Sequence, residues 1–131
     1  MDELPIESGD DVVRVRQHVR AAAAGTGLSL IDQTKLVTAA SELARNALVH
    51  AGGGRAQVEM AESAVGRTGI RITFTDDGPG IPDVDLALTD GWTTGDGLGL
   101  GLSGARRLVD EFELESKPGT GTKVVVAKWS R

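Results

Sequence analysis

The chain of 131 residues contains no cysteine, which excludes disulfide bonds, thiolate catalysis and cysteine-ligated metals. Aromatic residues make up only 3% of it, so the core must be built from Leu, Val, Ile and Ala. No apolar stretch approaches the roughly 20 residues of a membrane-spanning helix. The first eight residues also lack the apolar run of a signal peptide. These absences predict a cytoplasmic protein with no membrane contact.

A broad basic surface is also absent, because 14 Lys and Arg residues stand against 19 Asp and Glu residues. Proteins that bind nucleic acid carry concentrated positive charge, so we expect no nucleic-acid partner. The hydrophobic fraction of 40% and the charged fraction of 25% are typical of globular proteins. The length suits one domain covering residues 1–131.

Capping and periodicity signals predict alternating helices and strands. Ser-x-x-Asp capping boxes at Ser8 and Ser29 open two helices, which we expect to end at Gly25 and near His50. A third helix is marked by Leu102, Ala105, Val109 and Phe112. Strands are expected at 4–6, 56–60, 70–74, 114–116 and 123–129. Hairpin-length connections favour an α/β two-layer sandwich, with helices on one face of a mixed, mainly antiparallel sheet.

The second helix carries a polar pair that stands apart from its apolar stripe. At about 100° per residue, Glu42 and Asn46 fall on one face, one turn apart, where both can reach one ligand. The apolar stripe comprises Leu36, Ala40, Leu43, Ala47 and Ala51. Taken alone, the pair fits a solvated helix face as well as a site.

The segment Asp-Asp-Gly-Pro-Gly at 76–80 directly follows a predicted strand. It fits an ordinary turn, because Gly, Pro and Asp all favour turns. It also fits a site in which glycines let the backbone approach a flat ligand. A carboxylate such as Asp76 only accepts hydrogen bonds, so it would pair with the exocyclic amine of adenine and repel the carbonyl oxygen of guanine.

Glycines recur at every second position from Gly95 to Gly101, just before the third helix. Exposed backbone N–H groups and a helix start could cradle phosphates there, or the segment could be a plain surface loop. The segment lacks the Gly-Lys-Ser/Thr ending of a Walker loop. A dinucleotide site is rejected because no strand precedes the glycines and no acid follows at the required distance. The turn at 119–122 predicts nothing by itself.

Taken in order, the four segments resemble the motifs of the GHKL superfamily, which includes gyrase, Hsp90, histidine kinases and anti-sigma-factor kinases. The segments are SELARNALVHAGGG, DDGPGIPD, GDGLGLG and GTGT. The resemblance covers nearly the whole chain. It implies the Bergerat fold, in which ATP lies between helices and a lid.

The resemblance assigns roles to individual residues. It implies that Asp76 binds the adenine amine and that Thr122 supports the same edge through water. It places the backbone of Gly78 and Gly80 close to the base. Gly97, Gly99 and Gly101 would cover the phosphates.

The same resemblance implies a phosphoryl-transfer centre on the second helix. Asn46 would bind Mg²⁺ through its side-chain oxygen, which suits a hard cation that keeps several waters. Glu42 would lie near the γ-phosphate and accept the proton of an incoming serine hydroxyl. The expected cofactors are therefore ATP and Mg²⁺.

The longer motifs look like those of RsbT-type serine/threonine switch kinases. That likeness implies a STAS-domain substrate in a bacterial stress-response pathway, and a phosphatase that the released kinase then activates. A histidine kinase fits less well, because VRQHVRAAA around His18 lacks the acid and Pro of a phosphoacceptor box, and Val49 replaces a common Lys. Two alternatives stay open: an anti-sigma factor kinase that binds a sigma factor directly, and a nucleotide-gated binding module without transferase activity.

Overall fold

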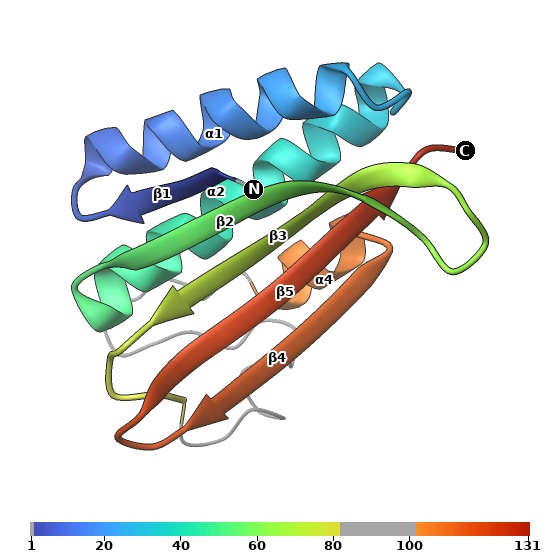
Figure 1. The fold of residues 1–131 in the computed structure, drawn as a ribbon. Coiled ribbons are helices and arrows are strands. Elements are labelled where there is room, and N and C mark those ends of the chain that lie inside the picture. Colours follow the sequence, from blue (N-terminus) through green and yellow to red (C-terminus); the bar gives the residue numbers. More distant parts are fainter. Residues whose placement is uncertain (1, 82–101) are drawn as a thin grey trace.

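The fold is a five-stranded sheet in the order β1-β2-β3-β5-β4 with helices on one face (Figure 1). The computed structural model describes residues 2–81 and 102–131. The strands are β1 (Asp2–Ile6), β2 (Gly54–Glu62), β3 (Thr68–Asp76), β4 (Glu111–Lys117) and β5 (Gly121–Trp129). All four described pairings are antiparallel. The predicted two-layer sandwich is confirmed.

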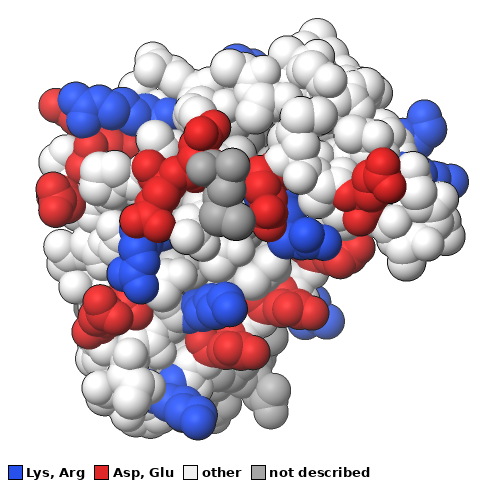
Figure 2. Space-filling model, viewed as in Figure 1, with Lys and Arg blue, Asp and Glu red and all other residues white. Residues whose placement is uncertain are grey.

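The helices are α1 (Gly9–Ala24), α2 (Leu30–Ala51) and α4 (Leu102–Leu108). They cover the sheet face to which alternate strand residues point, and Ile70, Ile72 and Phe74 of β3 are buried beneath them. The opposite sheet face carries charges of both signs, as Figure 2 shows. In the described ranges, no helix is long and apolar enough to span a membrane.

The serine half of both predicted capping boxes forms, whereas the two acidic residues contact groups other than the N-cap N–H. The Ser8 hydroxyl accepts from Asp11 N at 3.4 Å, and the Asp11 carboxylate accepts from Glu7 N at 2.8 Å. The Ser29 hydroxyl accepts from Asp32 N at 3.1 Å. Helix α2 ends where Gly52 adopts a φ of 74°, a conformation that residues with a side chain rarely adopt. These caps fix where α2 begins and ends along the sheet.

The prediction for the third helix was wrong at its C-terminal end. Helix α4 ends at Leu108, Val109 lies beyond it, and Phe112 belongs to β4. Strand β4 alternates exposed glutamates with half-buried residues, and this period of two marks a strand with one face on the core. The apolar spacing through Phe112 also suited a helix, but pairing with β5 decides the conformation.

A charged network that the sequence did not predict joins α2 to the end of β5. Lys128 is only 5% exposed, and its ammonium lies 3.7 Å from Asp32 and 3.6 Å from Asp110. Arg131 pairs with the same two carboxylates. The Asp110 carboxylate also accepts from Trp129 N at 2.8 Å. A buried cation needs such partners, so the network fixes the α2 N-terminus against the sheet.

Burial raises the pKa of Asp110, but the Trp129 backbone N–H and the cations of Lys128 and Arg131 outweigh that effect and bring the pKa below its ordinary value. A carboxyl group with a lowered folded pKa stabilises the fold above its unfolded pKa of about 3.9. This contribution disappears as the pH falls through the folded pKa.

Replacing Asp110 by Asn should therefore lower the free energy of unfolding at pH 7 by about 1–3 kcal/mol, because it leaves Lys128 with one carboxylate fewer. The difference from wild type should shrink as the pH falls below 4, where wild-type Asp110 becomes protonated. Urea unfolding at several pH values measures both effects. Glu113→Gln, on the exposed face of β4, is the matched control. A loss of stability that does not change with pH would contradict this role for the Asp110 charge.

Candidate functional site

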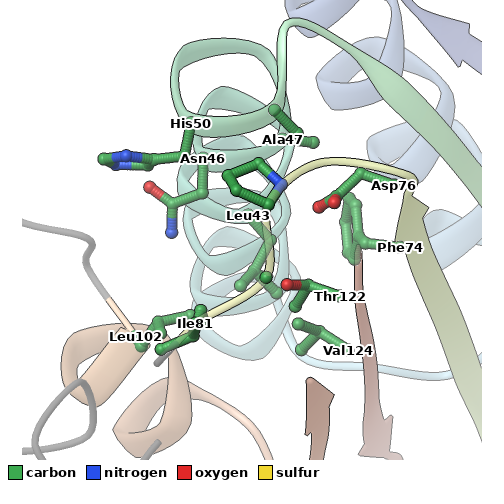
Figure 3. A pocket seen from close by; sticks show the side chains of 13 residues that line it. Leu43, Asn46, Ala47, His50, Phe74, Asp76, Ile81, Leu102, Thr122 and Val124 are labelled. Carbon is green, nitrogen blue, oxygen red and sulfur yellow. The ribbon is translucent and has the colours of Figure 1, made fainter. Parts of the chain in front are cut away.

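A cavity opens between α2 and the adjoining ends of β3 and β5 (Figure 3). It has a volume of about 210 Å³ and opens to solvent on one side. Its walls are mainly apolar and include Leu43, Ala47, Phe74, Ile81 and Val124. Its polar side chains are those of Asn46, His50, Asp76 and Thr122. An apolar slot with few polar groups suits a flat ring system.

Asp76 and Thr122 lie side by side because they are register partners on β3 and β5. Both side chains point into the cavity in Figure 3. One carboxylate oxygen of Asp76 accepts from Gly78 N at 3.0 Å, which fixes the orientation of the carboxyl group. The cavity therefore presents a fixed acceptor beside a hydroxyl group.

The glycines of the 76–80 loop are required by close packing. A Cβ on Gly78 would collide with the side chain of Ala51, which comes from the last turn of α2. Gly80 has a φ of 78°, and a Cβ there would collide with the carbonyl oxygen of Lys117. The loop can thus lie directly against α2 and the β4–β5 turn only because these residues have no side chain.

Substituting Gly78 by Ala should reduce nucleotide affinity at this cavity at least about tenfold, because relief of the collision moves the loop that carries Asp76. Titration calorimetry with ATP measures the change, and circular dichroism checks the fold. Gly9→Ala, at the start of α1 with no heavy atom within 4 Å of the added Cβ, is the control. If Gly78→Ala binds ATP as tightly as the wild type does, the position of this loop does not determine ATP affinity.

Two hydrogen bonds fasten the end of this loop to the β4–β5 hairpin. The Gly119 N–H donates to the Pro79 carbonyl at 2.8 Å, and the Ile81 N–H donates to the Ser116 hydroxyl at 2.7 Å. Sequence reasoning missed Ser116, because a lone serine in a strand carries no motif signal. The chain just before residue 82 is thereby held at the cavity wall.

Helix α2 brings Asn46 into the cavity lining but leaves Glu42 outside it. Glu42 lies one turn earlier on the same face of the helix and is half-buried. The two residues are thus arranged along α2 as the sequence predicted, with Glu42 beyond the apolar slot. Glu42 therefore lies beside the cavity rather than in it. This position suits a side chain that acts on the part of an elongated ligand that extends out of the cavity.

The structure leaves part of the predicted site undescribed. Gly97, Gly99 and Gly101 lie outside the described residues, as does the predicted lid. His50 lines the cavity, whereas His18 pairs with Asp2 at 3.0 Å on the surface of α1. Trp129 packs beneath Arg71, and its indole N–H donates to Glu111 at 2.7 Å.

The residues that line the cavity can be compared with the two groups that the family resemblance implies, ATP and Mg²⁺. The apolar slot and the Asp76 acceptor match a base with an exocyclic amine. Asn46 offers a side-chain oxygen, which is a suitable ligand for Mg²⁺ when phosphates and water supply the others. Among residues 2–81 and 102–131, no cluster of three or more His, Cys, Asp or Glu residues could hold a metal by itself.

Comparisons with known proteins agree with this geometry. Residues 31–130 match the family described as histidine kinase-, DNA gyrase B- and HSP90-like ATPases. The chain is 44% identical to the serine/threonine-protein kinase RsbT of Bacillus subtilis over 121 residues, which are 92% of this chain and 90% of that protein. It is 31% identical to an anti-sigma F factor of Caldanaerobacter subterraneus over 117 residues, which are 87% of this chain and 82% of that protein.

A solved structure shows the same fold at low sequence identity. The RsbU and RsbW domains of a Mycobacterium tuberculosis protein align with a TM-score of 0.63 at 23% identity. The alignment covers all of this chain, but this chain spans only 33% of that one. The likeness therefore concerns the fold alone.

Proposed function

Because the chain belongs to the family of histidine kinase-, DNA gyrase B- and HSP90-like ATPases and resembles a serine/threonine-protein kinase over 92% of its length, we infer that it is an ATP-dependent serine/threonine-protein kinase of a bacterial partner-switching pathway. The structural observation that supports its dependence on ATP is the cavity in which Asp76 and Thr122 lie together beside the closely packed Gly78.

Adenine fits the cavity with its amine toward Asp76. The carboxylate is an acceptor held by Gly78 N, so it matches an N–H donor and repels a carbonyl oxygen. Thr122 stands next to it and contacts the same edge of the base, directly or through a water. The apolar walls from Phe74 and Leu43 then cover the faces of the ring.

The phosphates extend along α2 from Asn46 toward Glu42. Asn46 would hold Mg²⁺ together with phosphate oxygens and water, and the metal would supply charge neutralisation during phosphoryl transfer. By the family resemblance, Gly97, Gly99 and Gly101 would cover the phosphates. Glu42 accepts the proton of the attacking hydroxyl as the general base. Glu42 lies outside the slot and is half-buried.

The protein substrate proposed here is a STAS-domain antagonist that carries the phosphoacceptor serine or threonine. After transfer, the kinase leaves this partner and activates a phosphatase of the same pathway. The 44% identity to RsbT supports this assignment over a related anti-sigma role. The choice of partner rests on resemblance to one subfamily, because a shared fold does not by itself identify the protein that a kinase binds.

The second candidate is an anti-sigma factor kinase that binds a sigma factor directly. Its support is the 31% identity to an anti-sigma F factor over 87% of the chain. Both candidates share the cavity and the chemistry of Glu42. They differ only in the protein that the kinase holds after transfer.

A capture experiment separates the two candidates. The purified chain is incubated with lysate of its own cells, Mg²⁺ and γ-labelled ATP, and the captured proteins are identified. Label on a serine or threonine of a STAS protein, with a phosphatase recovered, supports the switch kinase. Recovery of a sigma factor supports the second candidate. ATP binding without label on any protein would contradict both.

A further inference from the structure

The side of α2 that faces away from the core carries a straight row of residues, spaced alternately four and three apart. At about 100° per residue, these positions fall within an arc of about 80°, opposite the buried Leu36, Ala40 and Leu43. The row, which we call the α2 stripe, consists of Ile31, Lys35, Thr38, Glu42, Arg45 and Val49. All of these residues are exposed except Glu42, which is half-buried. The proposed general base therefore lies within an exposed helix face.

Two cations on the α2 stripe flank Glu42. Arg45 follows Glu42 by three residues, which is about 4.5 Å along the helix axis, and Lys35 precedes it by seven residues, about 10 Å. Neither cation makes a hydrogen bond or an ion pair with another described residue. By contrast, Arg71 on the opposite sheet face lies 3.8 Å from Glu59. The stripe thus offers two positive charges to a second molecule.

Exposed apolar side chains stand at both ends of the α2 stripe. Ile31 is 69% exposed and Val49 is 42% exposed, and both are among the few large apolar side chains that the described part of the chain leaves in solvent. A single exposed apolar residue needs no explanation, but these two share one helix face with the unpaired cations. Burial of their apolar area would add to the affinity that two exposed ion pairs supply only weakly.

The proposed reaction brings a second protein to this face. If Glu42 accepts the proton of the incoming hydroxyl, the protein surface that carries this hydroxyl must cover the exposed residues beside Glu42. An acidic surface would also be repelled by the phosphates of ATP. Lys35 and Arg45 offset this repulsion on the two sides of Glu42, whereas a basic surface would meet like charges at both positions. Charge complementarity therefore favours an acidic substrate.

We propose that the α2 stripe is the docking surface for the protein substrate, and that Lys35 and Arg45 select a substrate with acidic side chains on both sides of its acceptor hydroxyl. The inference rests on the proposed function, because it takes Glu42 as the general base. Lys35 and Arg45 bind the flanks of the acceptor site rather than the hydroxyl itself, so they are positioning residues. Ile31 and Val49 contact apolar side chains at the two ends of the same surface.

The test measures transfer from γ-labelled ATP, at saturating ATP and Mg²⁺, to the purified protein that the wild-type chain labels in the capture experiment. Lys35→Glu and Arg45→Glu should each raise the KM for this protein about fivefold. The kcat and the ATP dissociation constant should stay within about twofold of wild type. The two residues lie about 15 Å apart along the helix, so their effects should multiply to about 25-fold in the double variant.

Arg67→Glu is the matched control, because it makes the same charge change at an exposed arginine in the β2–β3 turn, at the far end of the sheet (Figure 1). It should leave the KM within about twofold of wild type. Lys35→Gln and Arg45→Gln remove each charge without reversing it and should raise the KM less, and they keep the comparison if a reversal does not fold. In about 1 M NaCl, where the screening length is about 3 Å, the differences in KM should disappear.

The outcomes separate this inference from the proposed function. An unchanged KM in both charge reversals, with wild-type transfer intact, would overturn the inference alone. So would an equal rise in Arg67→Glu, or a rise that persists in 1 M NaCl, because the effect would then not come from the charges of the α2 stripe. If the reversals spare transfer but remove a phosphatase or a sigma factor from the captured proteins, the stripe binds that partner and the inference is wrong. Failure of the wild-type chain to label any protein would overturn the proposed function, and the inference with it.

Discussion

Glu42→Gln is expected to leave ATP affinity within about twofold of wild type while slowing phosphoryl transfer by about 10²–10⁴-fold, the usual contribution of a general base. Glutamine keeps the shape of the side chain but cannot accept the hydroxyl proton. Binding should persist because Glu42 stands outside the cavity in which we propose that the base binds. Transfer should slow because, among the described residues, no other acidic residue of α2 lies within one turn of Asn46.

Transfer to the captured substrate protein is followed with γ-labelled ATP under single-turnover conditions, which separate chemistry from binding. Glu113→Gln makes the same change on the exposed face of β4 and should transfer at the wild-type rate. A Glu42→Gln variant that phosphorylates normally would remove Glu42 from the chemistry. If ATP affinity and the transfer rate fall by the same factor, Glu42 contributes to binding rather than to the chemical step.

Asp76→Asn should weaken ATP binding by about 10²-fold, because a hydrogen bond to a charged group is lost in an apolar slot. The amide oxygen of Asn can still accept the Gly78 N–H that now holds the carboxylate. The amide NH₂ would then face the cavity and oppose the adenine amine, donor against donor. A carbonyl oxygen would suit this NH₂, so the preference for ATP over GTP should fall as well.

The neighbouring Asp77 provides a matched control for this variant. Its side chain is 86% exposed and lies 3.7 Å from Arg55, and it does not line the main cavity. Asp77→Asn should therefore leave both affinities within about twofold of wild type, as expected for an exposed ion pair. Calorimetric titration of both variants with ATP and GTP measures the difference. Equal effects of the two substitutions would indicate a general charge effect and contradict a contact to the base.

Local sequence signals predicted much of the fold. The capping serines and following glycines placed α1 and α2, because caps satisfy backbone groups that a helix end leaves unpaired. The alternation of apolar and polar residues predicted strands β2 and β3. The resemblance to the GHKL superfamily implied that Asp76, Asn46 and Thr122 belong to one site, and in the structure all three line one cavity.

Features that depend on contacts between distant segments were not predictable in the same way. In the sequence, Phe112 fits the apolar spacing of a helix. In the structure it belongs to β4 and pairs with Val126 of β5. Lys128 lies in the strand expected at 123–129, but no local signal indicated that it is buried against Asp32 and Asp110. Ser116 had no motif, and only strand register places it beside Thr122.

The location of the nucleotide is tested most directly by amide chemical-shift mapping with ATP and Mg²⁺, which suits a chain of 13.6 kDa. The largest changes should occur at Gly78, Gly80, Ile81 and Thr122, with little change in the β2–β3 turn at 63–67, which lies at the far end of the sheet (Figure 1). Saturable shifts confined to residues away from the cavity, or no shifts at millimolar ATP, would contradict nucleotide binding between α2 and the ends of β3 and β5.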